Sequence, residues 1–278
     1  MLEKALSFSP DAYIPDMEDS VPPAEKNNAR QTVAEFLPKL GAAGPLVVPR
    51  VNAWDTGLMD DDLEAAISPN TYGISVGKIN DAQDIHRISA TMDRLEDTAG
   101  IPGTTRLIPW IETASAVVHA YEICTASPRV AAVAFGAEDF TNDMGIERTE
   151  DDREVAYARS AVCVAAKAAG VLAIDTPYFK YRDAEGLRRD ARAARGYGFR
   201  GKCAIYPDQV DVINEAFSPT RSEVENALHV VAAFEEAERN GRGSTSLDGK
   251  VVDVPVVKRA HGLLALARET GRDIPNEV

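Results

Sequence analysis

The sequence feature that most constrains the fold is a strand–helix–strand pattern between Arg106 and Phe140. Leu107–Ile111 and Val130–Phe135 are continuous apolar runs that are too short for helices, and between them small and apolar residues recur at helical spacing over Thr113–Thr125. Short apolar strands separated by helices are typical of a parallel sheet covered by helices on both faces. In such sheets ligands bind beyond the carboxyl ends of the strands, so the residues that follow each strand are the first candidates for a site.

The same alternation of strands and helices extends over most of the chain and favours a (β/α)8 barrel of the TIM type over an open sheet. Residues 1–6 resemble a helix more than a strand, so we expect the barrel to lack its usual first strand because the natural start of the chain is missing. The alternative is that residues 1–10 are irregular. The predicted strands are 12–16, 46–51, 73–77, 107–111, 130–135, 171–174 and 200–205.

We expect two domains, a catalytic barrel over residues 1–218 and a segment of C-terminal helices with a lid over residues 219–278. Within the second, Gly241–Gly249 has the composition of a flexible linker.

The composition excludes several classes of partner. A formal net charge of -14 argues against nucleic acid and anionic membranes, although a local cluster of Arg and Lys can still bind a small anion. The three cysteines are scattered among apolar segments, which favours buried thiols in a reducing compartment. The sequence contains no apolar run of membrane-spanning length and no secretory leader, so we expect a cytoplasmic protein.

Two carboxylates stand where the central strands end. Glu112 closes the first strand of the pattern, and Asp139 follows the second. On neighbouring strands they would supply the hard oxygen ligands that suit Mg²⁺. The alternative is that each is a helix cap or a first-turn acid that interacts favourably with the helix dipole. The other polar residues at predicted strand ends are Glu18, Asp19, Arg50, Lys78 and Asp175.

The basic residues at the strand ends have two interpretations each. Arg50 lies beside an apolar run and needs an anionic partner, and its planar fork suits a carboxylate or enolate oxygen. An ion pair with an acid such as Glu18 would satisfy it equally. Lys78 either contacts substrate or forms a simple salt bridge with Glu18 or Asp19. Asp175 is either a ligand or part of a turn.

Several common catalytic motifs are absent from the sequence. It has no Gly-x-Ser-x-Gly, no P-loop, no His-Glu-x-x-His and no Gly-x-Gly-x-x-Gly after a strand. The kind of site that these absences leave is a divalent metal held by carboxylates beside an arginine. Such a pair stabilises a developing enolate, which indicates chemistry alpha to a carbonyl: aldol or Claisen cleavage or condensation.

Five segments, taken together and in order, resemble the citrate lyase beta-subunit-like (HpcH/HpaI aldolase) CoA-ester lyases over almost the whole chain. The resemblance implies a (β/α)8 barrel with Mg²⁺, metal ligation by Glu112 and Asp139, and binding of a substrate or enolate oxygen by Arg50. It also places Glu18 and Asp19 in the pocket. The segments are Asp16–Lys26, Pro49–Asn52, Ile111–Thr113, Phe135–Phe140 and Gly249–Pro255.

The resemblance also implies a homotrimer or homohexamer in which a C-terminal segment covers a neighbour's site and offers Asp253 as an acid/base. A linker leading to a packing helix is the alternative. The chain departs from the family in lacking the initial Leu-Phe-Val-Pro-Gly strand. It also has Ile205-Tyr206-Pro207 where the family often has Ile-His-Pro, so Tyr206 is a candidate to contact CoA by packing or by a hydrogen bond.

The resulting expectation is a Mg²⁺-dependent carbon–carbon lyase that converts malyl-, methylmalyl- or citramalyl-CoA to acetyl- or propionyl-CoA and an alpha-keto acid. Three alternatives remain: a malyl-CoA thioesterase, a citrate lyase beta subunit that acts on a carrier-protein thioester, and a catalytically silent scaffold or binding subunit.

Overall fold

The computed structural model describes residues 2–149 and 151–271. By its internal contacts the chain divides into two compact units, Met1–Val210 and Asp211–Val278. This division falls near the start of helix α10 (Gln209–Phe217), whereas the domain boundary expected from the sequence, after residue 218, falls just past its end. Each unit is described by itself.

The larger unit is built on parallel strands that follow one another in chain order. Strands β3 to β8 form one six-stranded sheet, and β1 pairs with β2. The bounds are β1 (Ala12–Tyr13), β2 (Leu46–Val47), β3 (Arg50–Val51), β4 (Gly73–Val76), β5 (Arg106–Ile111), β6 (Ala132–Phe135), β7 (Leu172–Asp175) and β8 (Gly201–Lys202).

All seven predicted strands are present at their expected places. The strand predicted at 46–51 is divided into β2 and β3 on either side of Val48-Pro49, and a further bridge between Asp16 and Arg50 continues the pairing of β1. Within the described residues no pairing joins β8 to β1, and a short helix α1 (Leu2–Ala5) precedes β1. The parallel α/β fold is therefore confirmed, whereas closure of the strands into a barrel is not seen among the described residues.

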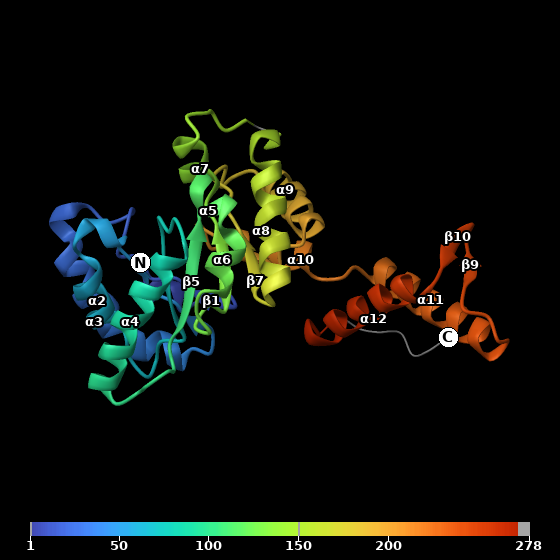
Figure 1. The fold of residues 1–278 in the computed structure, drawn as a ribbon, viewed down its shortest axis with the longest axis horizontal. Helices are drawn as coiled ribbons and strands as arrows, with labels where there is room; N and C mark the ends of the chain where they lie inside the picture. Colours follow the sequence, from blue (N-terminus) through green and yellow to red (C-terminus); the bar gives the residue numbers. More distant parts are fainter. Residues whose placement is uncertain (1, 150, 272–278) are drawn as a thin grey trace. The chain divides into compact units, whose positions relative to one another are not determined.

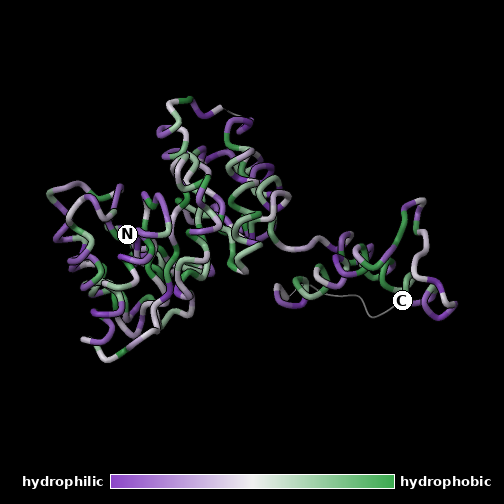
Figure 2. The backbone as a smooth tube through the Cα atoms, in the orientation of Figure 1, coloured by the Kyte–Doolittle hydropathy of each residue, from purple (hydrophilic) through white to green (hydrophobic). Residues whose placement is uncertain are grey.

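Helices surround these strands, and most of the sheet-forming segments are hydrophobic (Figures 1 and 2). The 3-10 turns are η1 (Pro23–Glu25), η2 (Trp54–Thr56) and η3 (Arg153–Val155). The remaining helices are α2 (Lys26–Ala42), α3 (Met59–Ala66), α4 (Ala82–Ala99), α5 (Ala114–Val118), α6 (Ala120–Thr125), α7 (Ala137–Asp143), α8 (Ala156–Ala169) and α9 (Ala184–Tyr197).

Helix α4 illustrates how the sequence sets an element. The side chain of Asp81 accepts hydrogen bonds from the backbone N–H groups of Gln83 and Asp84, which satisfies donors that a helix start leaves unpaired. Ile85 and Ile88 then lie on the inner face of the helix and are fully buried. The helix stops at Gly100, whose φ of 71° favours glycine.

Two predictions from the sequence were wrong in detail. The single helix predicted over Thr113–Thr125 is broken at His119 into α5 and α6. The predicted linker Gly241–Gly249 contains a strand, β9 (Thr245–Leu247), paired antiparallel with β10 (Lys250–Val252).

Within its described residues the smaller unit contains most of α10, then α11 (Arg221–Arg239), this hairpin and α12 (Val254–Glu269). The two helices pack side by side over an apolar core that includes Val230, Phe234 and Leu264. Among the described residues no helix is long and apolar enough to cross a membrane.

Candidate functional site

Charged side chains gather at the carboxyl ends of neighbouring strands in the larger unit. Arg50 lies in the two-residue strand β3, the last part of the strand predicted at 46–51; Lys78 lies two residues past β4, Glu112 directly follows β5, and Asp139 lies in the first turn of α7 after β6. Because these strands are parallel and adjacent, their carboxyl ends share one edge of the sheet. The structure thus brings together four of the residues singled out from the sequence.

Arg50 is held by two acids. Its Nε and Nη2 donate to the two carboxylate oxygens of Asp16 at 2.7 and 2.6 Å, and its Nη1 lies 3.2 Å from Glu18 Oε2. Burial alone would raise the pKa of Asp16, but the hydrogen bonds and charge of Arg50 lower it to about 2. The ion pair that was the alternative interpretation of Arg50 is therefore present, and the guanidinium binds Asp16 more closely than Glu18.

Glu18 is buried and incompletely paired. Its Oε1 has no hydrogen-bond partner in the described part of the chain, although Lys78 Nζ lies 3.4 Å away. Burial, followed by the charge of Asp19, raises the pKa of Glu18, while Arg50 and Lys78 oppose the rise. Lys26 Nζ holds the backbone here by donating to the Glu18 carbonyl at 2.8 Å.

Lys78 contributes both its side chain and its backbone. Its Nζ lies 3.2 Å from Asp19 Oδ1, and its backbone N–H donates to Glu112 Oε1 at 2.6 Å. The backbone has a φ of 57°, a left-handed conformation that costs a non-glycine residue free energy and is concentrated at functional sites. This conformation orients the N–H group toward Glu112.

The Glu112 carboxylate lies between two glycines. A Cβ on Gly77 would stand 2.7 Å from Oε1, and a Cβ on Gly136 would stand 2.4 Å from Oε2. Both distances are shorter than any ordinary contact, so each position requires glycine for the carboxylate to occupy its place. The backbone thus encloses a side chain that is only 3% exposed.

Glu112 and Asp139 form an acidic pair that favours a bound cation. Burial, then the charge of Asp139, raises the pKa of Glu112 to about 8. Burial, then the charge of Asp19, raises the pKa of Asp139. No hydrogen bond within residues 2–149 and 151–271 reaches the Asp139 carboxylate or Glu112 Oε2.

A divalent cation would relieve this burial of negative charge and use the unengaged oxygens. Mg²⁺ commonly takes only one or two protein carboxylates and keeps several waters. The pair is therefore sufficient for Mg²⁺, although the described residues hold no group of three or more His, Cys, Asp or Glu side chains arranged for a metal.

Two contributors to this site were not singled out from the sequence. Asp16 is the bidentate partner of Arg50, and Trp110 places its ring 5.7 Å from the Arg50 guanidinium, within cation–π range. The Trp110 Nε1 donates to Ser75 Oγ at 2.7 Å, which fixes the ring. Asp16 could have been found from the sequence, because it ends the predicted strand 12–16. For Trp110 the sequence offers no indication of a role in the site beyond its position inside β5.

Asp175 is a structural residue of the larger unit. It is completely buried, and it accepts hydrogen bonds from Arg159 Nη2 and Lys202 Nζ, both at 2.6 Å. A turn or a ligand was expected there, and the structure shows a buried ion-pair cluster instead.

Tyr206 and Asp253 remain candidates. Tyr206 is half-exposed and stacks on Tyr181 with ring centroids 4.3 Å apart. Asp253 belongs to the smaller unit, where its side chain caps α12 by accepting from the Val256 N–H at 3.3 Å.

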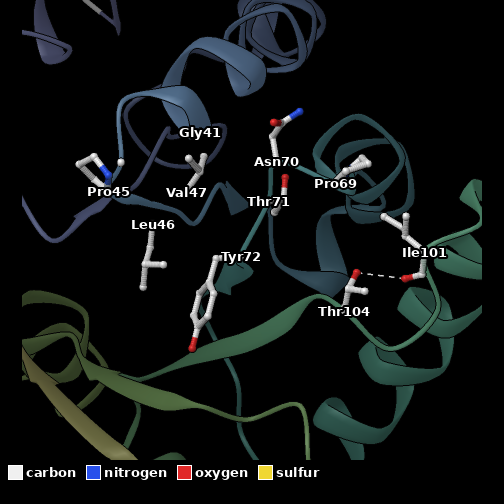
Figure 3. A pocket seen from close by; sticks show the side chains of 11 residues that line it. Gly41, Pro45, Leu46, Val47, Pro69, Asn70, Thr71, Tyr72, Ile101 and Thr104 are labelled. Atoms are coloured by element: carbon white, nitrogen blue, oxygen red, sulfur yellow. Dashed lines mark hydrogen bonds between the residues drawn. The ribbon is translucent and has the colours of Figure 1, made fainter.

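A cavity of about 450 Å³ lies at the opposite, amino-terminal ends of β2 and β4 (Figure 3). Leu46, Thr71 and Tyr72 are among its walls, and none of its lining residues is charged. It therefore offers no carboxylate, imidazole or thiol, and the charged edge is the better candidate for an active site.

Comparisons with known proteins identify the family. The HpcH/HpaI aldolase/citrate lyase family matches residues 1–207, so the chain belongs to that family. Among its relatives, the citrate lyase subunit beta of Leuconostoc mesenteroides subsp. cremoris is 38% identical over 96% of this chain and 89% of its own length.

Further relatives carry other activities in their names. The (3S)-malyl-CoA thioesterase of Cereibacter sphaeroides is 35% identical, covering 96% of this chain and 90% of its own. The mitochondrial citramalyl-CoA lyase of Rattus norvegicus is 31% identical, covering 96% and 82%. The solved structure of CitE from Mycobacterium tuberculosis in complex with magnesium, acetoacetate and coenzyme A is 31% identical, with a TM-score of 0.74 over 91% of this chain and 88% of that one.

Proposed function

We propose that the protein is a Mg²⁺-dependent lyase that cleaves a beta-hydroxyacyl-CoA of the malyl-, methylmalyl- or citramalyl-CoA type to acetyl- or propionyl-CoA and an alpha-keto acid. Membership of the family makes it a carbon–carbon lyase by class. The observation that carries the proposal is the acidic pair Glu112 and Asp139 with unengaged oxygens, at the same strand edge as the clamped Arg50.

Each charged group has a distinct task in this proposal. Glu112 and Asp139 would hold Mg²⁺, which when bound polarises the carbonyl oxygen of the keto acid as a Lewis acid. Arg50, oriented by Asp16, would donate to the oxygen that becomes this carbonyl. Glu18 has a raised pKa and an Oε1 that accepts no hydrogen bond from the described residues, which suit it to take the proton of the substrate hydroxyl.

The proton balance of the cleavage needs one donor as well. When the carbon–carbon bond breaks, the electron pair passes to the thioester as an enolate, whose alpha carbon must then be protonated. We assign this proton to Asp253 of a neighbouring subunit in a homotrimer or homohexamer. In the condensation direction the same carboxylate removes the alpha proton. Lys78 and Asp19 would line the pocket, and Tyr206 would contact the CoA moiety.

The direct test is incubation of the purified protein with malyl-CoA and citramalyl-CoA, in Mg²⁺ or in EDTA, with acetyl-CoA, free CoA and keto acid measured. Metal-dependent formation of acetyl-CoA and keto acid is expected, and the faster substrate identifies the acyl group. Absence of product from both esters, in a folded protein that does not bind Mg²⁺, would favour the silent scaffold or binding subunit and reject the proposal.

Two other functions have support in the relatives. A malyl-CoA thioesterase, favoured by the Cereibacter relative, would release free CoA together with malate. A citrate lyase beta subunit, favoured by the Leuconostoc relative, would act only on an acyl-carrier-protein thioester and would co-purify with partner subunits.

The three cysteines are free, in keeping with our further proposal that the protein works in the cytoplasm.

Binding of Mg²⁺ is expected to strengthen as pH rises. Since the pKa of Glu112 is raised to about 8, this carboxyl is mostly protonated in the metal-free protein at pH 7 and must lose its proton to bind a cation. The apparent affinity should therefore increase about tenfold per pH unit below pH 8 and level off above it. Calorimetric titration at pH 6, 7 and 8.5 in buffers of different ionisation enthalpy measures both the affinity and the proton released. A pH-independent affinity would contradict the assignment of Glu112.

Asp253 can be tested for chemistry apart from its capping role. Asp253→Asn keeps an oxygen that accepts from the Val256 N–H, whereas Asp253→Ala removes the cap at a cost of about 1 kcal/mol. We expect both variants to lose activity, and only the alanine variant to lower the thermal stability. Activity retained in Asp253→Asn would show that the residue is a helix cap without a part in proton transfer.

A further inference from the structure

Helix α7, which carries Asp139, is not capped by its own sequence. Gly136 precedes the helix and has no side chain to accept from the first free N–H groups. The hydroxyl of Thr176 fills this role from another strand, since Oγ1 accepts from the Ala137 N–H at 3.1 Å. Thr176 is 1% exposed, so the helix start is tied to the end of β7 by a buried hydrogen bond.

Thr176 is itself fixed by the ion-pair cluster behind it. Lys202 Nζ donates to the Thr176 carbonyl at 2.7 Å and to Asp175 Oδ2 at 2.6 Å, and its side chain is fully buried. Arg159 from α8 pairs with both Asp175 and Asp190 of α9. The residue that caps α7 is therefore held in place by buried ion pairs and hydrogen bonds among β7, β8, α8 and α9.

The other end of α7 is tied to the strand that delivers Glu112. Asp143, the last residue of α7, accepts from the Ala114 N–H through Oδ2 at 2.7 Å, and Ala114 lies two residues after Glu112. Since both ends of this short helix are anchored, the position of Asp139 in its first turn depends on the two anchors. The buried anchor at Thr176 is the one closer to Asp139 along the helix.

We propose that Thr176 is a positioning residue for the metal site, which sets the place of Asp139 opposite Glu112 through the Ala137 N–H. The proposal rests on the proposed function in that it takes Asp139 as a ligand of Mg²⁺. Groups that orient a metal ligand without touching the metal typically contribute about 10- to 100-fold to metal affinity. Loss of the Thr176 hydroxyl is expected to have an effect in this range.

The test is calorimetric titration with MgCl₂ of the full chain and its variants at pH 8.5. Thr176→Val has the same shape without the acceptor and should raise the Kd for Mg²⁺ by about tenfold or more, whereas Thr176→Ser keeps a hydroxyl and should stay within about threefold of the wild type. Thr71→Val is the matched control, because Thr71 is a buried threonine whose hydroxyl donates to the Ala66 carbonyl at the other end of the strands.

Turnover distinguishes positioning from a general loss of structure. For Thr176→Val, kcat measured at saturating Mg²⁺ should recover to near the wild-type value, since the ligands themselves are intact. If Thr176→Val does not fold, Thr176→Ala, which removes the acceptor with less crowding, takes its place. Wild-type affinity in the variant that lacks the hydroxyl would overturn the inference. A wild-type protein that does not bind Mg²⁺ would instead reject the proposed function.

Discussion

Glu112→Gln is expected to lower turnover by about a thousandfold or more and to abolish detectable Mg²⁺ binding, while the protein remains folded. Lewis-acid stabilisation by a metal is worth several kcal/mol, and about 1.4 kcal/mol corresponds to a factor of ten in rate. The glutamine keeps the oxygen that accepts from the Lys78 N–H, so the local backbone has no reason to change. Asp139→Asn should behave in the same way.

The stability of this variant gives an independent readout. The pKa of Glu112 is raised in the folded state to about 8 from the ordinary 4.5. Between these values the folded protein binds a proton that the unfolded chain has lost, so the free energy of unfolding falls as pH rises, and the loss is complete above pH 8. In EDTA, Glu112→Gln should therefore have a higher Tm than the wild type at pH 8.5 and nearly the same Tm at pH 4.5. Full activity, or a Tm difference that shrinks with rising pH, would contradict this account.

Arg50→Lys is expected to reduce turnover by about 100- to 1000-fold, the usual effect of losing one donor to a developing oxyanion. The guanidinium engages both oxygens of Asp16 and also approaches Glu18. A single ammonium cannot reproduce these directed contacts and still donate to substrate.

Arg129→Lys is a suitable control for this experiment. Arg129 is also buried and clamped by acids, with Nη2 2.6 Å from Glu96 Oε2, but it precedes β6 at the amino-terminal edge of the sheet. Both variants should lose some thermal stability, and only Arg50→Lys should lose turnover. An equal loss of activity in the two would mean that the effect of Arg50 is structural.

The sequence predicted the strands well because each is a short apolar run between polar segments, and their order along the chain is also their order in the sheet. It failed where local signals compete. The stretch Gly241–Gly249 has a linker composition, yet Asp248-Gly249 is the dipeptide that favours a two-residue hairpin turn, and both residues have positive φ, at 51° and 75°. In this segment the turn-forming dipeptide, and not the linker-like composition, determines the structure.

The candidate site could be located from the sequence but not assembled from it. Parallel strands place their carboxyl ends together, so Arg50, Glu112 and Asp139 could be grouped by their positions alone. Which acid Arg50 engages could not be predicted, because three acids lie between residues 16 and 19 and only the folded backbone decides which one faces the guanidinium. The burial of Asp175 likewise depends on side chains from α8 and β8, far away in sequence.

The two glycines that flank Glu112 have a consequence for engineering. Since a side chain at Gly77 or Gly136 would collide with the carboxylate, neither wall of this part of the site can be remodelled by substitution. Attempts to change the metal or keto-acid preference of the proposed site should therefore start from Asp139, Lys78 and Asp19, which are more exposed than Glu112. A randomised library that spares the glycines should retain many more folded, metal-binding members than one that includes them.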